Sequence, residues 1–256
     1  MRTLCVFLFS VVAAFAQSVE GRRLFDLGVG AFEQARYDEA ALYFRKAVQT
    51  DPRFMDARLY LAGTFMVQYI PGAKSETNTR VATQARDAFM GVLELDPNNI
   101  EALSSISDIY FLQEKLDEAE QWYQRLTTAA PKHKEAYYTL GVIAWTRAFR
   151  ARMEVRARLG LSPDDPGPIP DYVARQELKS KNLPALQRGM ESLSIALTLD
   201  PEYDDAMAYM NLLLRERADL ADDADGYRKD TEAADGWVDK TLQTKKAKAA
   251  RSAPPQ

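Results

Sequence analysis

A pattern of two helical stripes recurs along the chain and limits its fold more than any other feature. In residues 21–54, small or apolar residues stand at i, i+3, i+4 and i+7, as on one helix face: Leu24, Leu27, Gly28 and Ala31. A second stripe follows at Ala40, Phe44 and Ala47, and Pro52 closes the unit. The short stretch 34–38 separates the stripes. This spacing predicts two helices joined by a tight turn.

Five registers of this unit can be laid along the chain, and two are longer than the others. They cover residues 21–54, 55–99, 100–133, 134–203 and 204–242. The second register spans 45 residues and the fourth spans 70, against 34 in the first. The excess predicts insertions at about 70–80 and 148–183. Pro71 and Gly72 favour a loop between the two helices of the second register.

The fourth register predicts several segments in succession. A helical pattern covers residues 135–159 and contains no Pro or Gly after Trp145, which predicts one long helix. Residues 160–170 carry four prolines and two glycines and cannot be helical. A short helix is expected near 171–180, and a new one is expected to begin near Asn182 and Pro184.

The pattern resembles the tetratricopeptide repeat (TPR), which has W-x2-L-G-x2-Y, then A-x3-F, then P, on a period of 34 residues. The resemblance covers about residues 21–242. It implies an all-α fold, a right-handed α-solenoid of about five helix–turn–helix repeats with a long insertion in the fourth. The last repeat is degenerate, as terminal repeats often are.

In this family the first helix of each repeat lines a concave groove. Nine of the fifth, sixth and twelfth positions of the repeats carry large apolar residues, and seven of these nine are aromatic: Phe25, Phe32, Leu59, Tyr60, Met66, Phe111, Tyr138, Trp145 and Tyr209. The resemblance therefore predicts a groove that binds a protein or peptide partner. Phe25 and Val29 stand where carboxylate-clamping relatives have Lys and Asn, so an extended apolar or helical ligand is expected. Alternatively, the insertions fold back and bury these rings.

Residues 147–158 form a possible basic arm. Three arginines share one side of the expected helix: Arg147, Arg150 and Arg158. Two more, Arg152 and Arg156, lie among them, and Glu154 is the one acidic residue of the stretch. The arm could meet an acidic partner or lipid headgroups. It could instead be a solvated face whose arginine stems pack over the repeats and pair with Asp164 and Asp165.

The two ends of the chain differ from the repeats. Residues 4–15 are almost wholly apolar, and small residues at Ala14 and Ala16 precede Gln17. This predicts a signal peptide over residues 1–16, cleaved after Ala16, and export to the periplasm or beyond. The single cysteine, Cys5, would be removed with it. Lysines, Arg251 and the final Ala-Pro-Pro predict a basic, disordered tail over residues 243–256.

Composition and motifs point away from catalysis and from nucleic acid. The net charge of −4 lacks the basic footprint of nucleic-acid-binding proteins. The single histidine, His133, lies between two lysines, where it should be solvated. Gly28 and Gly30 lack the third glycine of a dinucleotide motif, because Glu33 stands there. We therefore expect no enzymatic activity, metal or cofactor.

Two functions remain open on the sequence. The first is a non-enzymatic adaptor or scaffold that holds a partner polypeptide in the aromatic groove. The second is a structural subunit of a cell-envelope or secretion assembly that binds through the fourth-repeat insertion.

Overall fold

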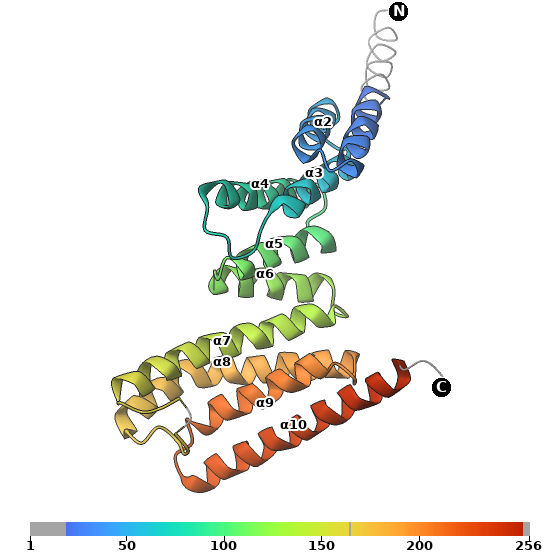
Figure 1. Ribbon diagram of the computed structural model, residues 1–256. Helices are drawn as coiled ribbons and strands as arrows, with labels where there is room; N and C mark the ends of the chain where they lie inside the picture. Colours follow the sequence, from blue (N-terminus) through green and yellow to red (C-terminus); the bar gives the residue numbers. More distant parts are fainter. Residues whose placement is uncertain (1–18, 164, 253–256) are drawn as a thin grey trace, which may run out of the picture. The chain divides into compact units, whose positions relative to one another are not determined.

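A computed structural model describes residues 19–163 and 165–252 of the chain (Figure 1). The predicted signal peptide and residues 253–256 lie outside the described residues. Within them the chain forms ten helices and no strand. Residues 19–33 are helical and are followed by α2 (Tyr37–Thr50), α3 (Met55–Gln68), α4 (Glu76–Leu93), α5 (Ile100–Leu112), α6 (Leu116–Ala129), α7 (Lys134–Arg158), α8 (Tyr172–Leu199), α9 (Asp204–Ala218) and α10 (Ala224–Ser252).

The helices fall into two compact units, unit 1 (residues 1–129) and unit 2 (residues 130–256). In the described part, unit 1 holds the helices up to α6, and unit 2 holds α7 to α10. Each of the five repeat spans expected from the sequence contains two helices. Among the helices of residues 19–163 and 165–252, none combines the length and the hydrophobicity that a membrane span needs.

In unit 1, sequential helices pack against each other through small residues and rings. Phe44 of α2 is fully buried against the helix of residues 19–33. Gly28 makes this close approach possible, because a Cβ there would lie 2.5 Å from the Phe44 ring. The glycine of the repeat pattern therefore serves helix–helix packing.

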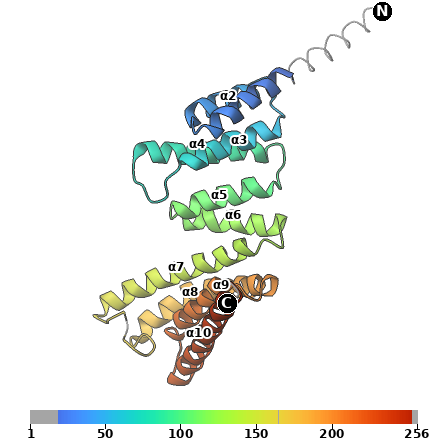
Figure 2. The same ribbon diagram turned by 45° about the vertical axis from the view of Figure 1, so that its right-hand side comes forward.

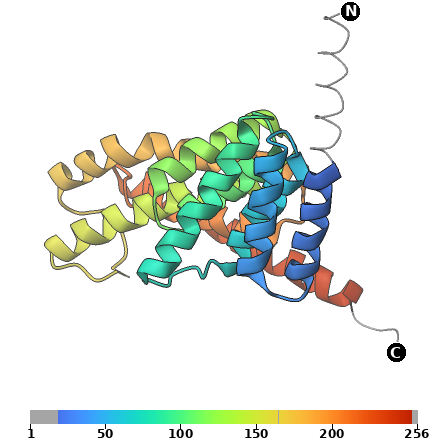
Figure 3. The same cartoon turned by 90° about the horizontal axis from the view of Figure 1, so that it is seen from above.

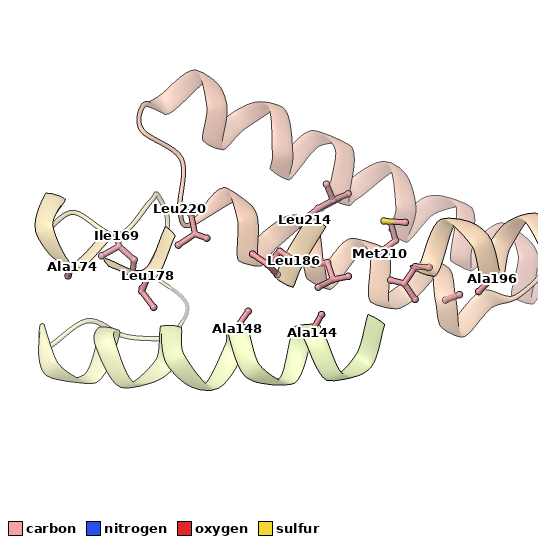
Figure 4. Close-up of a cluster of buried hydrophobic side chains, with 14 residues drawn as sticks. Ala144, Ala148, Ile169, Ala174, Leu178, Leu186, Ala196, Met210, Leu214 and Leu220 are labelled. Carbon is pink, nitrogen blue, oxygen red and sulfur yellow. The ribbon is translucent and has the colours of Figure 1, made fainter. Parts of the chain in front are cut away.

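In unit 2, α7 and α8 are long helices that lie side by side (Figure 2). Glycines again allow close contact, since a Cβ at Gly141 would lie 2.5 Å from Leu193. The second half of α7 and the first half of α8 extend together, and the described residues between them, 159–163 and 165–171, belong to a loop (Figure 3). Ile169 of this loop and Leu178 of α8 join a buried cluster with Leu220, which follows α9 (Figure 4).

The prediction of two helices over 171–199 is wrong, because α8 runs without a break from Tyr172 to Leu199. Pro184 lies inside α8, where it removes one hydrogen bond and crowds the preceding turn. Leu178 and Leu186, on either side of this proline, are buried in the same cluster. Burial of both halves of the helix offsets the local cost of the proline.

The insertion predicted at 70–80 is a loop only over residues 69–75, and Glu76 to Arg80 form the first turns of α4. Ser75 caps α4 by accepting a hydrogen bond from the backbone of Asn78. The buried Asn78 side chain in turn bonds the backbone of Ile70 and of Ala73, all at 2.8 Å. A single side chain thus holds the loop against α4.

The prediction of a disordered tail is wrong for residues 243–252, which continue α10. Acidic side chains before and at the start of α9 hold this last part of α10. Lys248 pairs with Asp204, and Arg251 pairs with Glu202 at 2.7 Å. Two of the charges that suggested a disordered tail, those of Lys248 and Arg251, therefore have partners in the fold.

Candidate binding surfaces

An open cleft of about 260 Å³ lies on unit 1, between the helix of residues 19–33, α3 and α5. We call it the α3 cleft. Its lining residues are Phe32, Asp56, Leu59, Tyr60, Gly63, Val67 and Glu101. Three of the residues predicted to face a groove, Phe32, Leu59 and Tyr60, meet here.

Part of the lining of the α3 cleft is apolar and exposed. The Tyr60 side chain is 44% exposed and Val67 is 53% exposed. A ring cluster beneath Tyr60 supports it: its ring meets that of Phe25 edge-on at 5.0 Å and that of Phe44 at 5.4 Å between centroids. The cleft therefore offers a side chain that is accessible to a partner and held in place by its neighbours.

The structure places the other unit 1 candidates elsewhere. Phe25 is only 6% exposed, so its prediction as a groove residue is wrong. It packs among Phe44, Phe54 and Tyr60, because the helices of the first repeat and α3 converge on it. Met66 and Phe111 are half-buried and do not line the cleft.

Two features of the α3 cleft were missed by sequence reasoning. Gly63 leaves its floor open, since a Cβ there would meet nothing within 4 Å. Asp56 and Glu101, both exposed, stand in the first turns of α3 and α5. They occupy the second position of their repeats, so the repeat register could have indicated them.

In unit 2 the predicted groove residues form a continuous row of rings, which we call the aromatic row. Tyr209 of α9 contacts Tyr138 at 5.4 Å and Trp145 at 5.5 Å, both on α7. Tyr203 adds to one end of the row and Phe149 stacks on Trp145 at the other. Every member is half-buried.

Burial in the aromatic row also affects the phenol groups. Loss of solvent raises the pKa of Tyr203 to about 12 and raises the pKa of Tyr209 and Tyr138. These phenols are therefore neutral at physiological pH. The rings cover one another, and Phe149 of the predicted insertion stacks on Trp145. The aromatic row is thus less accessible than the α3 cleft.

The predicted basic arm divides into exposed and buried arginines. Arg150 and Arg158 are exposed and Arg147 is half-buried. Arg152 and Arg156 turn inward and do not pair with Asp165, whose carboxylate accepts a hydrogen bond from the Ser162 backbone at 2.6 Å.

The inward arginines bind two carboxylates at the end of α9 in an ion-pair cluster. Arg152 Nε lies 2.8 Å from a Glu216 oxygen, and Arg156 Nη2 lies 3.0 Å from an Asp219 oxygen. The Glu216 and Arg156 side chains are only 4% and 3% exposed. Burial raises the pKa of both carboxyl groups, and the two guanidinium groups oppose that rise.

The ion-pair cluster fastens the extended part of α7 to α9. Sequence reasoning missed it, although a signal exists. Glu216 follows the apolar residues Leu213 and Leu214 near the end of α9, and Asp219 is the residue just after that helix; a carboxylate buried at such a position needs a charged or hydrogen-bonding partner.

No group of three or more His, Cys, Asp or Glu residues within 19–163 and 165–252 could hold a metal ion. His133 has a structural role, because its Nδ1 accepts a hydrogen bond from the Ala136 backbone at 3.2 Å and caps α7.

Comparisons with known proteins agree with the helical repeats. Residues 25–68 and residues 82–141 each match a family model described as tetratricopeptide repeat. A search of curated proteins finds no match.

Solved structures of MamA share the fold. A crystal structure of MamA protein aligns with a TM-score of 0.61 and 15% identity, over 93% of this chain and 98% of that chain. MamA from residue 41 to its end, from Desulfovibrio magneticus RS-1, aligns with a TM-score of 0.56 and 15% identity, over 89% and 96% of the two chains. The likeness shows that the chain has the all-α fold of a TPR-like α-solenoid.

Proposed function

We propose that this tetratricopeptide repeat protein is a non-enzymatic scaffold that binds a segment of a partner polypeptide in the α3 cleft. The observation that carries the proposal is the exposed Tyr60 ring, which packs on the buried Phe25 ring and lies beside the unobstructed space at Gly63. An aromatic side chain that is already ordered loses little conformational freedom on binding, and such rings supply much of the energy at interfaces.

The proposed site of action is outside the cytoplasm. The apolar run over residues 4–15 and the small residues before Gln17 support cleavage after Ala16. A mature chain that begins at Gln17 is the expected result of N-terminal sequencing after expression in a bacterial host. A mature chain that begins at Met1 would contradict the export proposal and leave the binding proposal intact.

Filling the α3 cleft tests the binding proposal. We expect Gly63→Leu to abolish capture of partner polypeptides from an envelope extract, because the new side chain occupies the space a ligand would use. The fold should persist, since the Cβ meets no atom within 4 Å. Gly30→Leu is the matched control: its Cβ is equally unobstructed, and Gly30 does not line the cleft.

Circular dichroism should show equal helicity for both variants. Undiminished capture by Gly63→Leu would refute the proposed function. A simultaneous loss in Gly30→Leu would show that the effect is not specific to the cleft.

The second candidate function, a structural subunit that assembles through the unit 2 insertion, is favoured by one observation. At the start of α8, Tyr172 and Val173 are 65% and 64% exposed. They lie within the insertion predicted over residues 148–183, whose α7 part the ion-pair cluster fastens to α9. We expect Tyr172→Ser with Val173→Ser to eliminate any self-association seen by light scattering; unchanged self-association would contradict this role.

A further inference from the structure

We infer that the polypeptide segment held in the α3 cleft is basic and apolar, with a lysine or arginine beside the apolar side chain that fills the cleft. This inference rests on the proposed function and specifies the chemistry of the partner. It is carried by the distribution of charge around an otherwise apolar cleft.

The charged groups that line the α3 cleft all have the same sign. Asp56 and Glu101 are its two charged lining residues, and no lysine or arginine of the described chain lines it. Both side chains are exposed. Glu33, which follows the lining residue Phe32 in the chain, is a third exposed carboxylate.

The helix ends beside these carboxylates do not cancel their charge. Asp56 and Glu101 are second residues of α3 and α5, where the helix dipole contributes about half a positive charge. Each carboxylate carries a full negative charge, so a negative potential remains over the cleft. A cation of the ligand would lower that potential.

A neighbouring acidic residue, unlike the two that line the cleft, has a cationic partner within the chain. Asp26, on the first helix of repeat one, is bound by Arg22 at 3.0 Å, so its charge is already matched within the chain. Neither Asp56 nor Glu101 forms an ion pair with any described residue of the chain. The carboxylates that line the cleft are therefore the ones available to a ligand.

The charge pattern also decides among classes of ligand. Phosphate-rich ligands and acidic chain ends would be repelled by Asp56 and Glu101. A basic side chain has a long apolar stem that can lie along Tyr60 while its charged end reaches a carboxylate. A basic, apolar polypeptide segment thus matches both the apolar wall and the charged edge of the cleft.

A displayed library of random 12-residue peptides tests the inference on the full chain. Selection on the wild-type protein, with removal of peptides that also bind Gly63→Leu, retains ligands that depend on the cleft. We expect the retained peptides to be enriched in lysine and arginine next to leucine or aromatic residues.

The charge dependence is then measured directly. For a selected peptide, replacing its basic residues by glutamine should weaken binding about three- to tenfold at low salt, since two exposed ion pairs are lost. Asp56→Asn with Glu101→Gln should remove this difference between the peptides. Added salt should also reduce it.

The outcomes separate the inference from the proposed function. Cleft-dependent peptides without basic enrichment, or a charge preference that survives Asp56→Asn with Glu101→Gln, would overturn the inference while the α3 cleft remains a binding site. If no selected peptide depends on Gly63, both the inference and the proposed function fail.

Discussion

Removing Asp219 should destabilise unit 2 strongly, because it binds Arg152 and Arg156 and the second of these arginines is buried. The Arg156 side chain is 3% exposed and lies 3.0 Å from Asp219. Glu216 cannot replace the lost partner, since Arg152 already binds it at 2.8 Å. Taking away one partner of a buried ion pair leaves an uncompensated charge, at a cost of about 3–5 kcal/mol. Asp219→Ala should lower the free energy of unfolding by about this amount.

Urea unfolding followed by tryptophan fluorescence measures the change. The chain has three tryptophans, of which Trp145 and Trp237 lie in unit 2 and Trp122 in unit 1. In a Trp122→Phe background the signal therefore reports unit 2. With a slope of about 2 kcal/mol per molar urea, a loss of 4 kcal/mol lowers the midpoint by about 2 M.

The matched control is another arginine–carboxylate pair of unit 2 that is exposed to solvent. Arg251 and Glu202 lie 2.7 Å apart with side chains 58% and 50% exposed. Glu202→Ala should barely move the midpoint, since solvent already stabilises both charges. If Asp219→Ala lowered the midpoint no more than Glu202→Ala does, the reasoning about a buried cluster would be refuted.

Three further predictions concern packing, the loop of unit 1 and acid. Gly28→Ala should lower the free energy of unfolding by about 1–3 kcal/mol through overpacking. Gly30→Ala should raise it by about 0.4–1 kcal/mol, because alanine restricts the unfolded chain and its Cβ meets nothing in the fold. Equal effects in urea unfolding would contradict the packing argument. Asn78→Ala should lower the free energy of unfolding by about 1–3 kcal/mol and increase proteolytic cleavage within residues 69–75. Unchanged cleavage would show that the loop does not depend on this side chain. Lys248 lowers the pKa of Asp204, so this pair stabilises the fold above the unfolded pKa of about 4 and the contribution is lost as the pH falls further. The protection of the backbone amides in residues 243–252, taken as the intrinsic exchange rate at each pH divided by the measured rate, should therefore fall below about pH 4. It should fall less in Lys248→Met, and an equal fall would exclude the pair as its cause.

The helices and most of their turns could be predicted because their signals are local. The stripe and the absence of Pro and Gly after Trp145 predict a helix over 135–159, and α7 spans Lys134–Arg158. The prolines of 160–170 likewise predict the loop that follows. Helical spacing and backbone restrictions act within a few residues, so the sequence contains them directly.

Which side chains become buried depends on contacts with residues that are distant in the chain. Arg152 and Arg156 bind carboxylates 64 and 63 positions away, and no local pattern pairs them. Phe25 has the repeat position of a groove residue, yet convergence of three helices buries it. The continuity of α8 through Pro184 also depends on distant contacts. Burial of the residues on both sides of the proline stabilises the helix by more than the proline destabilises it.

For the candidate site, the sequence by itself determined the aromatic character of the first helices, through the repeat register. Only the tertiary structure decided which of those rings remain accessible. Tyr60 stays exposed beside an open Gly63, whereas the rings of unit 2 cover one another. The physical reason is that accessibility depends on how neighbouring helices approach, and side chains far apart in the sequence set that approach.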